Sequence, residues 1–386
     1  MENNIGKEKA TMRFLYVAPR YHTNQIPVMK GLIEHGHSVF FFSHYAGKIE
    51  DYSHVVPEII GYSTFFNLIN FLYTKVLHNG EQRAADWKLL CGFPPIIKMN
   101  RRIREVNPDF VILRERSVYS MVTFLICKRR KIRTILYNQS PLYGEVKTDM
   151  AHRVVNKLTP QMRITPVIGD PEKKKDPKAF FVPFIMELQC APDKKEYCQN
   201  GEIHIFTVGK YEKRKNLLMM VRVFRELSKA YAIRLTIAGE CSSKFHNAYH
   251  ETLREYIASN RLEDKVTLLQ NLKREEMDRI YERTDLFVLP STLEPASISQ
   301  LEAMAFSIPV ICSDTNGSAC YVENGHNGYL FRDNEEKSLK EAMEKIIKDP
   351  GLLKEMGRNS YQDVKEKYQF ENYYEGVMEC ICSREE

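Results

Sequence analysis

Two carboxylates, Glu294 and Glu302, are separated by seven residues in the stretch Leu286–Phe331. Apolar runs on either side of them predict buried strands, and the segment from Ser299 predicts the start of a helix. Free backbone N–H groups at a helix start attract phosphate, and a carboxylate beside them accepts hydrogen bonds from sugar hydroxyls. The combination favours a nucleotide-sugar over a bare phosphate as ligand.

Each carboxylate also has a purely structural interpretation. Ser299-x-x-Glu302 has the spacing of a capping box, which needs only a local helix start. Glu294 could be an ordinary carboxylate of a surface turn. The residues before the helix, Ser297, Ile298 and Ser299, could offer backbone N–H groups to a phosphate.

A second group of charges follows Gly209 at the end of an apolar run. A glycine there permits a tight turn from strand to helix, and cations at the turn could neutralise a diphosphate. The alternative is a solvated cluster of surface charge. The cations concerned are Lys210, Lys213, Arg214 and Lys215.

The elements that must position these residues alternate between short apolar strands and helices, which is typical of parallel α/β architecture. The expected strands are Arg13–Ala18, Ser38–Ser43, Phe110–Arg114, Arg133–Tyr137, Phe180–Phe184, Ile203–Gly209, Arg234–Glu240, Lys265–Gln270, Leu286–Ser291, Pro309–Asp314 and Gly328–Phe331. Since the carboxyl ends of parallel strands meet at one edge of a sheet, the charged turns of the second half should converge there.

Helices are expected between these strands and at the end of the chain. They are Ile26–Gly36, Thr64–Leu77, Leu217–Ala230, His246–Asn260 and Phe370–Cys382. The aromatic face of Thr64–Leu77 is interpreted first as core and second as a surface that binds a membrane. The expected linker between two domains is Leu188–Glu202.

The composition is that of a globular protein with two domains, since 386 residues exceed one ordinary core. No apolar run approaches the roughly 18–20 residues that span a bilayer, and the polar N-terminal segment lacks an apolar signal core. The nine cysteines are scattered without a C-x-x-C pair, which favours reduced thiols in the cytoplasm. No D-x-D pair is present to bind a metal–diphosphate, and no zinc pattern occurs.

The charge of the chain is unevenly distributed. Residues 1–190 contain 28 Lys and Arg against 17 Asp and Glu, whereas residues 191–386 contain 28 against 33. The positive excess centres on residues 128–133. A single cluster of this kind is usually a solvated helix end, but the imbalance of a whole half predicts an anionic partner such as a membrane surface or a lipid phosphate.

Taken in order, the motifs of the second half resemble the nucleotide-binding domain of glycosyltransferase family 4, whose members are retaining enzymes of the GT-B fold. The match covers roughly residues 203–331, and it includes an AGxG-like turn at Gly239. The matching segments are Val208–Asn216, Ala238–Cys241, the two glutamates with seven residues between them, Glu302–Val310, Ser313-Asp314 and Asn327–Phe331.

The resemblance implies a role for each matching position. Lys215 takes the place of the lysine that contacts the donor diphosphate, and Lys210 stands where the family usually has arginine, which keeps the charge but loses bidentate geometry. Glu294 would hold hydroxyls of the donor sugar, and Glu302 those of the ribose. The amides of Ile298 and Ser299 would meet the phosphate, with Gly209, Gly239 and Ser297 completing the donor site.

The sequence departs from the family pattern at three places. The Gly-Phe-Gly expected after the first glutamate reads Pro295-Ala296-Ser297, which makes this loop stiffer. The Gly-Gly loop after the first strand is replaced by Pro19–Gln25. The family histidine after the strand Arg133–Tyr137 is replaced by Asn138-Gln139.

Catalytic and acceptor residues are expected on both halves. Glu294, Lys215, Lys210 and Asn138 are the expected catalytic residues. His22, Asn24, Arg114 and Arg116 are the expected residues on the acceptor side, where a buried, salt-bridged arginine is the alternative for the last two.

The resemblance implies two doubly wound, Rossmann-like domains facing a cleft. We expect a disordered tail at residues 1–11, an acceptor domain at 12–190, a donor domain at 191–365, and a C-terminal helical segment at 366–386 that crosses back to the first domain. The expected activity is metal-independent, retaining transfer of a sugar, by default from a UDP-sugar, to a hydroxyl of a glycan or lipid-linked acceptor in cell-surface polysaccharide or glycolipid synthesis.

Two alternatives remain open, a catalytically silent nucleotide-sugar-binding subunit and a nucleotide-sugar 2-epimerase. Nucleic acid is not an expected partner, because it leaves the carboxylate pair without a role. The expected location is cytoplasmic, with peripheral binding to the inner face of the membrane.

Overall fold

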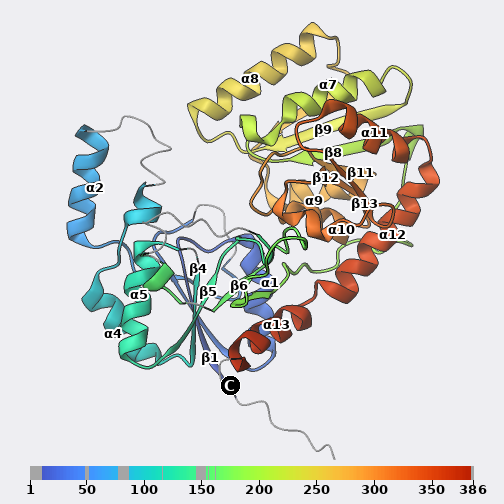
Figure 1. Ribbon diagram of the computed structural model, residues 1–386. Coiled ribbons are helices and arrows are strands. Elements are labelled where there is room, and N and C mark those ends of the chain that lie inside the picture. Colours follow the sequence, from blue (N-terminus) through green and yellow to red (C-terminus); the bar gives the residue numbers. More distant parts are fainter. Residues whose placement is uncertain are drawn as a thin grey trace, which may run out of the picture.

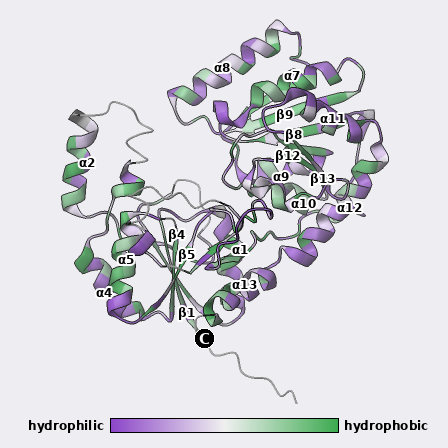
Figure 2. Ribbon diagram, in the orientation of Figure 1, coloured by the Kyte–Doolittle hydropathy of each residue, from purple (hydrophilic) through white to green (hydrophobic). Residues whose placement is uncertain are grey.

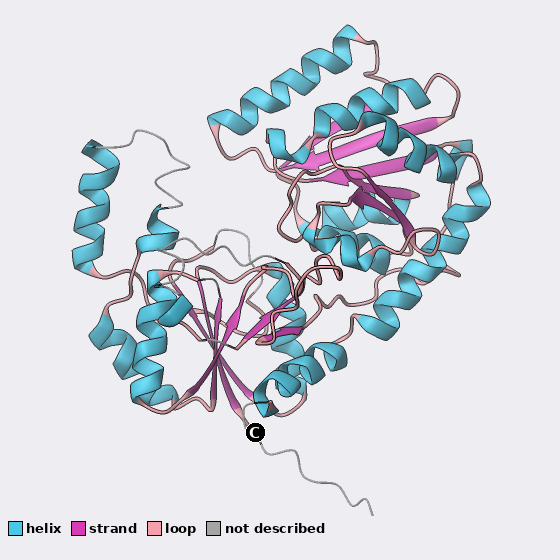
Figure 3. Cartoon of the chain, in the orientation of Figure 1, coloured by secondary structure: helices cyan, strands magenta, loops and turns pink. Residues whose placement is uncertain are grey.

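The computed structural model describes residues 11–47, 52–76, 87–114, 116–144, 154, 156–160 and 162–383. The expected tail at residues 1–11 lies outside these ranges except for Thr11, and so does Leu77 at the end of an expected helix. The described chain forms two lobes, each built around a twisted parallel sheet with helices on both faces (Figures 1 and 3).

The first sheet has seven parallel strands in the order β3-β2-β1-β4-β5-β6-β7. Its strands are β1 (Arg13–Ala18), β2 (Ser38–Ser43), β3 (Glu58–Ile59), β4 (Phe110–Arg114), β5 (Arg133–Tyr137), β6 (Arg163–Thr165) and β7 (Ala179–Phe181). The prediction was right for β1, β2, β4 and β5, missed β3 and β6, and extended the last strand to Phe184. The missed strands have two and three residues, too few to show a period.

Helices cover both faces of this sheet because adjacent residues of each strand point to opposite sides. Phe14 and Tyr16 of β1 pack toward α1 (Ile26–Glu34) and α13 (Phe370–Cys382). Leu15 and Val17 pack toward α4 (Ile96–Val106) and α5 (Val118–Arg129). The central strands are therefore apolar along most of their length, as the hydropathy colouring shows (Figure 2).

The second sheet has six parallel strands in the order β10-β9-β8-β11-β12-β13. They are β8 (Ile203–Val208), β9 (Ile233–Gly239), β10 (Val266–Gln270), β11 (Leu286–Leu289), β12 (Val310–Ser313) and β13 (Gly328–Phe331). One face packs against α7 (Leu217–Leu227), α8 (Lys244–Ser259) and α11 (Glu336–Ile347). The other packs against α9 (Arg274–Arg283) and α10 (Ser299–Ala305).

In both sheets the chain starts near the middle, adds strands outward on one side and then returns to add the rest on the other. The reversal falls between β1 and β4 in the first sheet and between β8 and β11 in the second. Ligands of doubly wound sheets bind beyond the carboxyl ends of the strands at such a reversal. The predicted fold class, two doubly wound α/β units of the GT-B type, is confirmed.

The end of the chain returns to the first lobe. After α12 (Pro350–Lys367), the helix α13 packs beside α1, β6 and β7 (Figure 1). The hydroxyls of Tyr16 on β1 and Tyr373 on α13 lie 3.0 Å apart in a hydrogen bond.

Among the described residues, none of the helices combines the length and apolarity that crossing a bilayer requires.

The helix α2 (Thr64–Val76) differs from its first interpretation as core. Phe66 is buried and packs against Tyr62 and Phe93, with ring centroids 5.6 and 5.7 Å away, so this edge attaches the helix to the lobe. Phe65 and Leu72, by contrast, are 65% and 52% exposed. Most of its apolar face is therefore on the surface, because the helix stands away from the sheet (Figure 1).

Candidate functional site

The turn after β8 carries Lys215 to the carboxyl end of the second sheet. Gly209 follows the strand, and the one-turn helix η3 (Lys213–Lys215) precedes α7. A Cβ atom on Gly209 would lie 3.0 Å from the Cδ of Lys215, tighter than most such contacts. The glycine therefore leaves the space through which the lysine side chain passes.

Lys215 and Arg214 both reach Glu294, which follows β11. The Lys215 Nζ is 2.6 Å from the Glu294 Oε2, and both side chains are about nine-tenths buried. Arg214 donates to the same oxygen at 2.5 Å. Two cations on one carboxylate leave an excess positive charge at the end of the sheet, and low-dielectric surroundings strengthen its attraction for an anion.

Backbone contacts fix the loop that presents Glu294. The N–H of Gly317 donates to the Glu294 carbonyl at 2.8 Å, and the N–H of Thr292 donates to the Arg214 carbonyl at 2.9 Å. A Cβ on Gly317 would overlap the carbonyl oxygen of Pro295, so the close approach of the two loops requires glycine at this position. Leu293 has a positive φ of 45° and is exposed, which places backbone strain beside the carboxylate.

Glu302, in the first turn of α10, bonds to residues of α9 rather than to its own helix start. Its carboxylate accepts from Arg274 Nη1 at 2.6 Å and from the Tyr281 hydroxyl at 3.0 Å. Burial, together with the charge of Glu302, raises the pKa of Tyr281 well above its usual value, so the phenol remains a donor. The capping-box interpretation is wrong: Ile298 is the N-cap, with no side-chain cap bond.

The segment Ser297–Ser299 forms the start of α10, with Ile298 as its N-cap and Ser299 as its first residue. Its Ser297 N–H donates to the Ser318 hydroxyl at 2.6 Å, which corrects the expectation that this amide is offered to a phosphate. The hydroxyls of Ser297 and Ser299 lie 2.7 Å apart. The phosphate contacts expected of the Ile298 and Ser299 amides stay a prediction.

The turn after β9 completes this edge of the sheet. A Cβ on Gly239 would overlap the carbonyl oxygen of Gly209, so the two turns approach at backbone distance. Lys210, half exposed, lies 3.6 Å from Glu240. Gly209, Gly239, Lys210, Lys215 and Glu294 were predicted to converge, and the parallel strand ends place their turns at the same edge.

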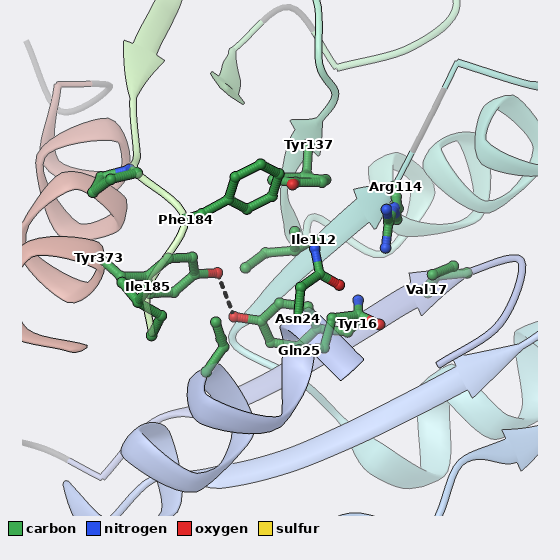
Figure 4. A pocket seen from close by; sticks show the side chains of 13 residues that line it. Tyr16, Val17, Asn24, Gln25, Ile112, Arg114, Tyr137, Phe184, Ile185 and Tyr373 are labelled. Carbon is green, nitrogen blue, oxygen red and sulfur yellow. Dashed lines mark hydrogen bonds between the residues drawn. The ribbon is translucent and has the colours of Figure 1, made fainter. Parts of the chain in front are cut away.

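The first lobe contains a pocket of about 500 Å³ beside the carboxyl ends of β1, β4 and β5 (Figure 4). Apolar and aromatic side chains make up most of its wall. Two of the predicted acceptor residues, Arg114 and Asn24, also line it. Tyr373 brings α13 into the wall through its bond to Tyr16. The lining residues are Tyr16, Val17, Ala18, Asn24, Gln25, Val28, Ile112, Arg114, Tyr137, Pro183, Phe184, Ile185 and Tyr373.

The other two expected acceptor residues, His22 and Arg116, are not among the residues that line this pocket. Burial, together with the charges of Arg114, Arg20 and Lys210, lowers the pKa of His22 to about 3. The imidazole is therefore neutral near pH 7. Lys210 belongs to the second lobe, so the charges of both lobes act on this side chain.

Asn138, which stands where the family has histidine, is buried in a polar network. Its Oδ1 accepts from Arg163 Nη1 and from the Ser140 N–H, each at 3.3 Å. Arg163 is 2% exposed and pairs with Asp176 at 2.8 Å. Burial and the charge of Arg163 lower the pKa of Arg116, so this arginine lies near the same network.

Several residues of the site were missed by sequence reasoning. Arg274 and Tyr281 on α9 bind Glu302, and Tyr373 on α13 lines the pocket, yet none of them belongs to a recognised motif. The run of charges around Arg274 indicates a solvated helix equally well. Arg163 is the first residue of a strand of only three residues, which is too short to show a period.

Residues 193–363 match the family described as "Glycosyl transferases group 1". This match contains Lys210, Lys215, Glu294 and Glu302, the residues on which the predicted site depends. The second half of the chain belongs to this family. The prediction of a relation to glycosyltransferase family 4 is thereby confirmed.

Curated relatives match slightly less than half of the chain. The capsular polysaccharide biosynthesis glycosyltransferase CapM of Staphylococcus aureus is 25% identical over 189 residues, 49% of this chain and 48% of that protein. The alpha-monoglucosyldiacylglycerol synthase of Acholeplasma laidlawii is 28% identical over 175 residues, 45% of this chain and 42% of that protein. The chain thus spans less than half the length of these curated relatives.

Solved structures resemble the whole chain. HepE of Anabaena in complex with UDP has a TM-score of 0.72 at 12% identity and covers 97% of this chain and 100% of that chain. A glycosyltransferase from Rickettsia africae has a TM-score of 0.71 at 14% identity and covers 96% and 97%. At these identities the likeness shows the shared two-lobed fold.

The described residues contain no group of three or more His, Cys, Asp or Glu side chains arranged to hold a metal ion. All nine cysteines are free thiols.

Proposed function

We propose that this protein is a retaining glycosyltransferase that moves a sugar from a nucleotide-sugar to an acceptor hydroxyl. The observation that carries the proposal is the buried cluster of Lys215, Arg214 and Glu294 at the carboxyl end of the second sheet. A carboxylate held by two cations can accept hydroxyl hydrogen bonds while the cations face a diphosphate.

The proposed roles on the donor side are those that the family resemblance implies for these positions. Lys215 and Lys210 would neutralise the diphosphate, and Glu294 would hold hydroxyls of the sugar. Glu302, fixed by Arg274 and Tyr281, would hold the ribose. The amides of Ile298 and Ser299 would meet the phosphate, at an edge where Gly209 and Gly239 remove side chains from the approach.

In the proposed reaction the bond between the anomeric carbon and the diphosphate oxygen breaks, and a bond to the acceptor oxygen forms on the same face. The acceptor proton passes to the departing phosphate oxygen, so no protein base is required. Lys215, Lys210 and Arg214 would stabilise the charge that develops on the diphosphate. The cations supply this stabilisation without a bound metal, and closure of the two lobes would exclude water.

We propose that residues 12–190 bind the acceptor, residues 191–365 the donor, and residues 366–386 return to the first domain. The pocket beside Arg114 is largely apolar, which suits an acceptor with an apolar part and an anionic group. His22, near Asn24 and Arg114, would lie between the two substrates, and Asn138 would hold its network in place.

The names of relatives support a lipid or glycan acceptor. One is a capsular polysaccharide biosynthesis enzyme, and another is a glucosyldiacylglycerol synthase. The positive first half is consistent with peripheral binding to an anionic membrane surface on its cytoplasmic side. The UDP bound to HepE makes a UDP-sugar the first donor to test.

A thermal-shift panel of UDP-, GDP-, ADP- and CDP-sugars tests the donor. We expect the melting temperature to rise with the sugars of one base only, since a ligand that binds the native state stabilises it. No shift with any of them would refute the donor site. A catalytically silent protein would show the shift without turnover, and a 2-epimerase would change the sugar without an acceptor.

A further inference from the structure

The helix α2 presents an apolar stripe to solvent. Phe65, Leu68, Ile69 and Leu72 stand at positions i, i+3, i+4 and i+7, which lie on one side of a helix. All four are exposed. The opposite edge is attached to the lobe by Phe66 and by Tyr73, which stacks on Trp87 at 4.5 Å.

The stripe continues onto α4. The N–H of Ser63, directly before α2, donates to the carbonyl of Phe93 at 2.9 Å, so the two helices begin beside each other. Ile96 and Ile97, the first residues of α4, are 54% and 86% exposed. An apolar surface of this kind on a single lobe needs a partner to cover it.

Positive charge follows directly after these apolar residues. Arg101 and Arg104 lie one and two turns beyond Ile97 on the same side of α4, and both are exposed. Asn100 accepts from Arg130 at 2.8 Å, which joins α4 to the basic end of α5. Figure 2 shows α4 hydrophobic at its start and hydrophilic toward its end.

The net charge of this surface restricts its occupant. The helices α2, α4 and α5 contain seven lysines and arginines against a single glutamate. A second copy of the same surface would bring like charges together across a symmetric interface. Apolar side chains beside a basic rim match an anionic bilayer, where the first enter the acyl boundary and the second meet lipid phosphates.

We propose that the exposed faces of α2, α4 and α5 form one surface that binds an anionic lipid bilayer. The apolar stripe of α2, with Ile96 and Ile97, enters the bilayer, while Arg101, Arg104 and Lys128 contact the headgroups. The proposal stands on this surface alone and holds whether or not the second half transfers a sugar.

Flotation of the full chain with vesicles tests the proposal. The wild type should bind vesicles of phosphatidylglycerol and phosphatidylcholine, and should bind vesicles of phosphatidylcholine alone at least about tenfold more weakly. Phe65→Gln/Leu72→Gln should reduce binding to the anionic vesicles at least about tenfold. Arg101→Gln/Lys128→Gln should do the same and should make binding less dependent on salt.

Matched controls separate the surface from general effects. Ile33→Gln/Phe245→Gln removes apolar side chains of similar total exposure elsewhere, and Arg254→Gln/Lys337→Gln removes exposed charges from the second lobe. Both should bind like the wild type, as should the donor-site variant Glu294→Ala.

Three results would overturn the proposal. They are absence of wild-type binding to anionic vesicles, unchanged binding of the α2 variant, and a wild-type dimer that the α2 variant converts to monomer. The last result would assign the surface to a second copy of the chain.

Discussion

Lys215 and Glu294, 79 residues apart in the chain, form a buried ion pair of 2.6 Å at the carboxyl end of the second sheet. The turn after β8 and the loop after β11 meet there because the two strands are neighbours in the sheet. Burial of such a pair costs desolvation, so it contributes little to stability by itself. The pair lies at the strand reversal, where doubly wound sheets bind their ligands, and this position is the basis of its proposed role in donor binding.

Loss of either partner should abolish sugar transfer. We expect Glu294→Ala and Lys215→Ala each to reduce turnover at least about 10²-fold, because each removes charge aimed at the reacting groups. Circular dichroism should show an intact fold in both. The measurement is transfer from the donor identified by the thermal-shift panel.

The control for this pair is Arg222→Gln, which breaks the exposed ion pair between Arg222 and Glu336 on the same lobe. Exposed pairs contribute only about 0–1 kcal/mol, so this variant should keep wild-type turnover. Full activity of Glu294→Ala would exclude the assigned site.

Gly317 should be required for full activity although it has no side chain that could contact a substrate. Gly317→Ala would drive a Cβ into the Pro295 carbonyl and displace the loop that presents Glu294. A displacement of about 1 Å can cost roughly 10²-fold in rate, so we expect turnover to fall at least tenfold. Gly351→Ala, at the start of α12 where its nearest neighbour is the Asp349 side chain, should leave turnover unchanged.

Glu302 should contribute to both donor affinity and stability. In Glu302→Ala the fully buried Tyr281 hydroxyl loses its acceptor, which should lower the free energy of unfolding by about 1–3 kcal/mol. In a Tyr281→Phe background the same substitution should cost less stability, because no hydroxyl is left unpaired.

Donor affinity separates the two contributions of Glu302. If its carboxylate holds the ribose, the affinity for the nucleotide-sugar falls by a similar factor in the wild-type and Tyr281→Phe backgrounds. If the substitution leaves the affinity for the nucleotide-sugar unchanged in both backgrounds, the only role of Glu302 is to hold α9 against α10 through Arg274 and Tyr281.

His44 should make the stability of the protein depend on pH. Burial against Tyr119, with ring centroids 3.5 Å apart, lowers the pKa of His44 to about 3 in the folded state. The unfolded chain, with a histidine pKa of about 6.5, then binds more protons than the folded chain. The stabilising contribution is complete above pH 6.5 and falls by about 1.4 kcal/mol per pH unit as the pH drops below it.

Urea unfolding of the wild type and His44→Phe at pH 7, 6 and 5 measures this contribution. The difference in unfolding free energy between the two should change with pH in this window, in favour of the variant at low pH. His54 is exposed, so the unfolding free energy of His54→Phe should change with pH as that of the wild type does. Parallel curves for the wild type and His44→Phe would contradict the burial argument.

The sequence predicts the main strands well because they are long enough to show uniform apolar runs. Arg13–Ala18 and Arg133–Tyr137 occur at the predicted bounds. Glu58–Ile59 and Arg163–Thr165 were not predicted, because they have only two and three residues. Arg163 is in addition paired with Asp176, 13 positions later in the chain. Local patterns contain no information about that partner.

The donor side was predicted in outline because its residues follow strands whose ends must meet. The partners of Glu302 were not, because Arg274 and Tyr281 lie on a helix that the motif does not include. The exposure of α2 was also missed. Amphipathic periodicity identifies an apolar face but does not indicate whether protein or lipid covers it.

Turnover of nucleotide-sugars without acceptor, followed by proton NMR at the anomeric signals, tests the central claim most directly. The account predicts slow release of free sugar from one nucleotide-sugar, first as the same anomer as the donor, and no release by Glu294→Ala. The inverted anomer as first product, release of an epimerised sugar, or equal turnover by wild type and Glu294→Ala would contradict it.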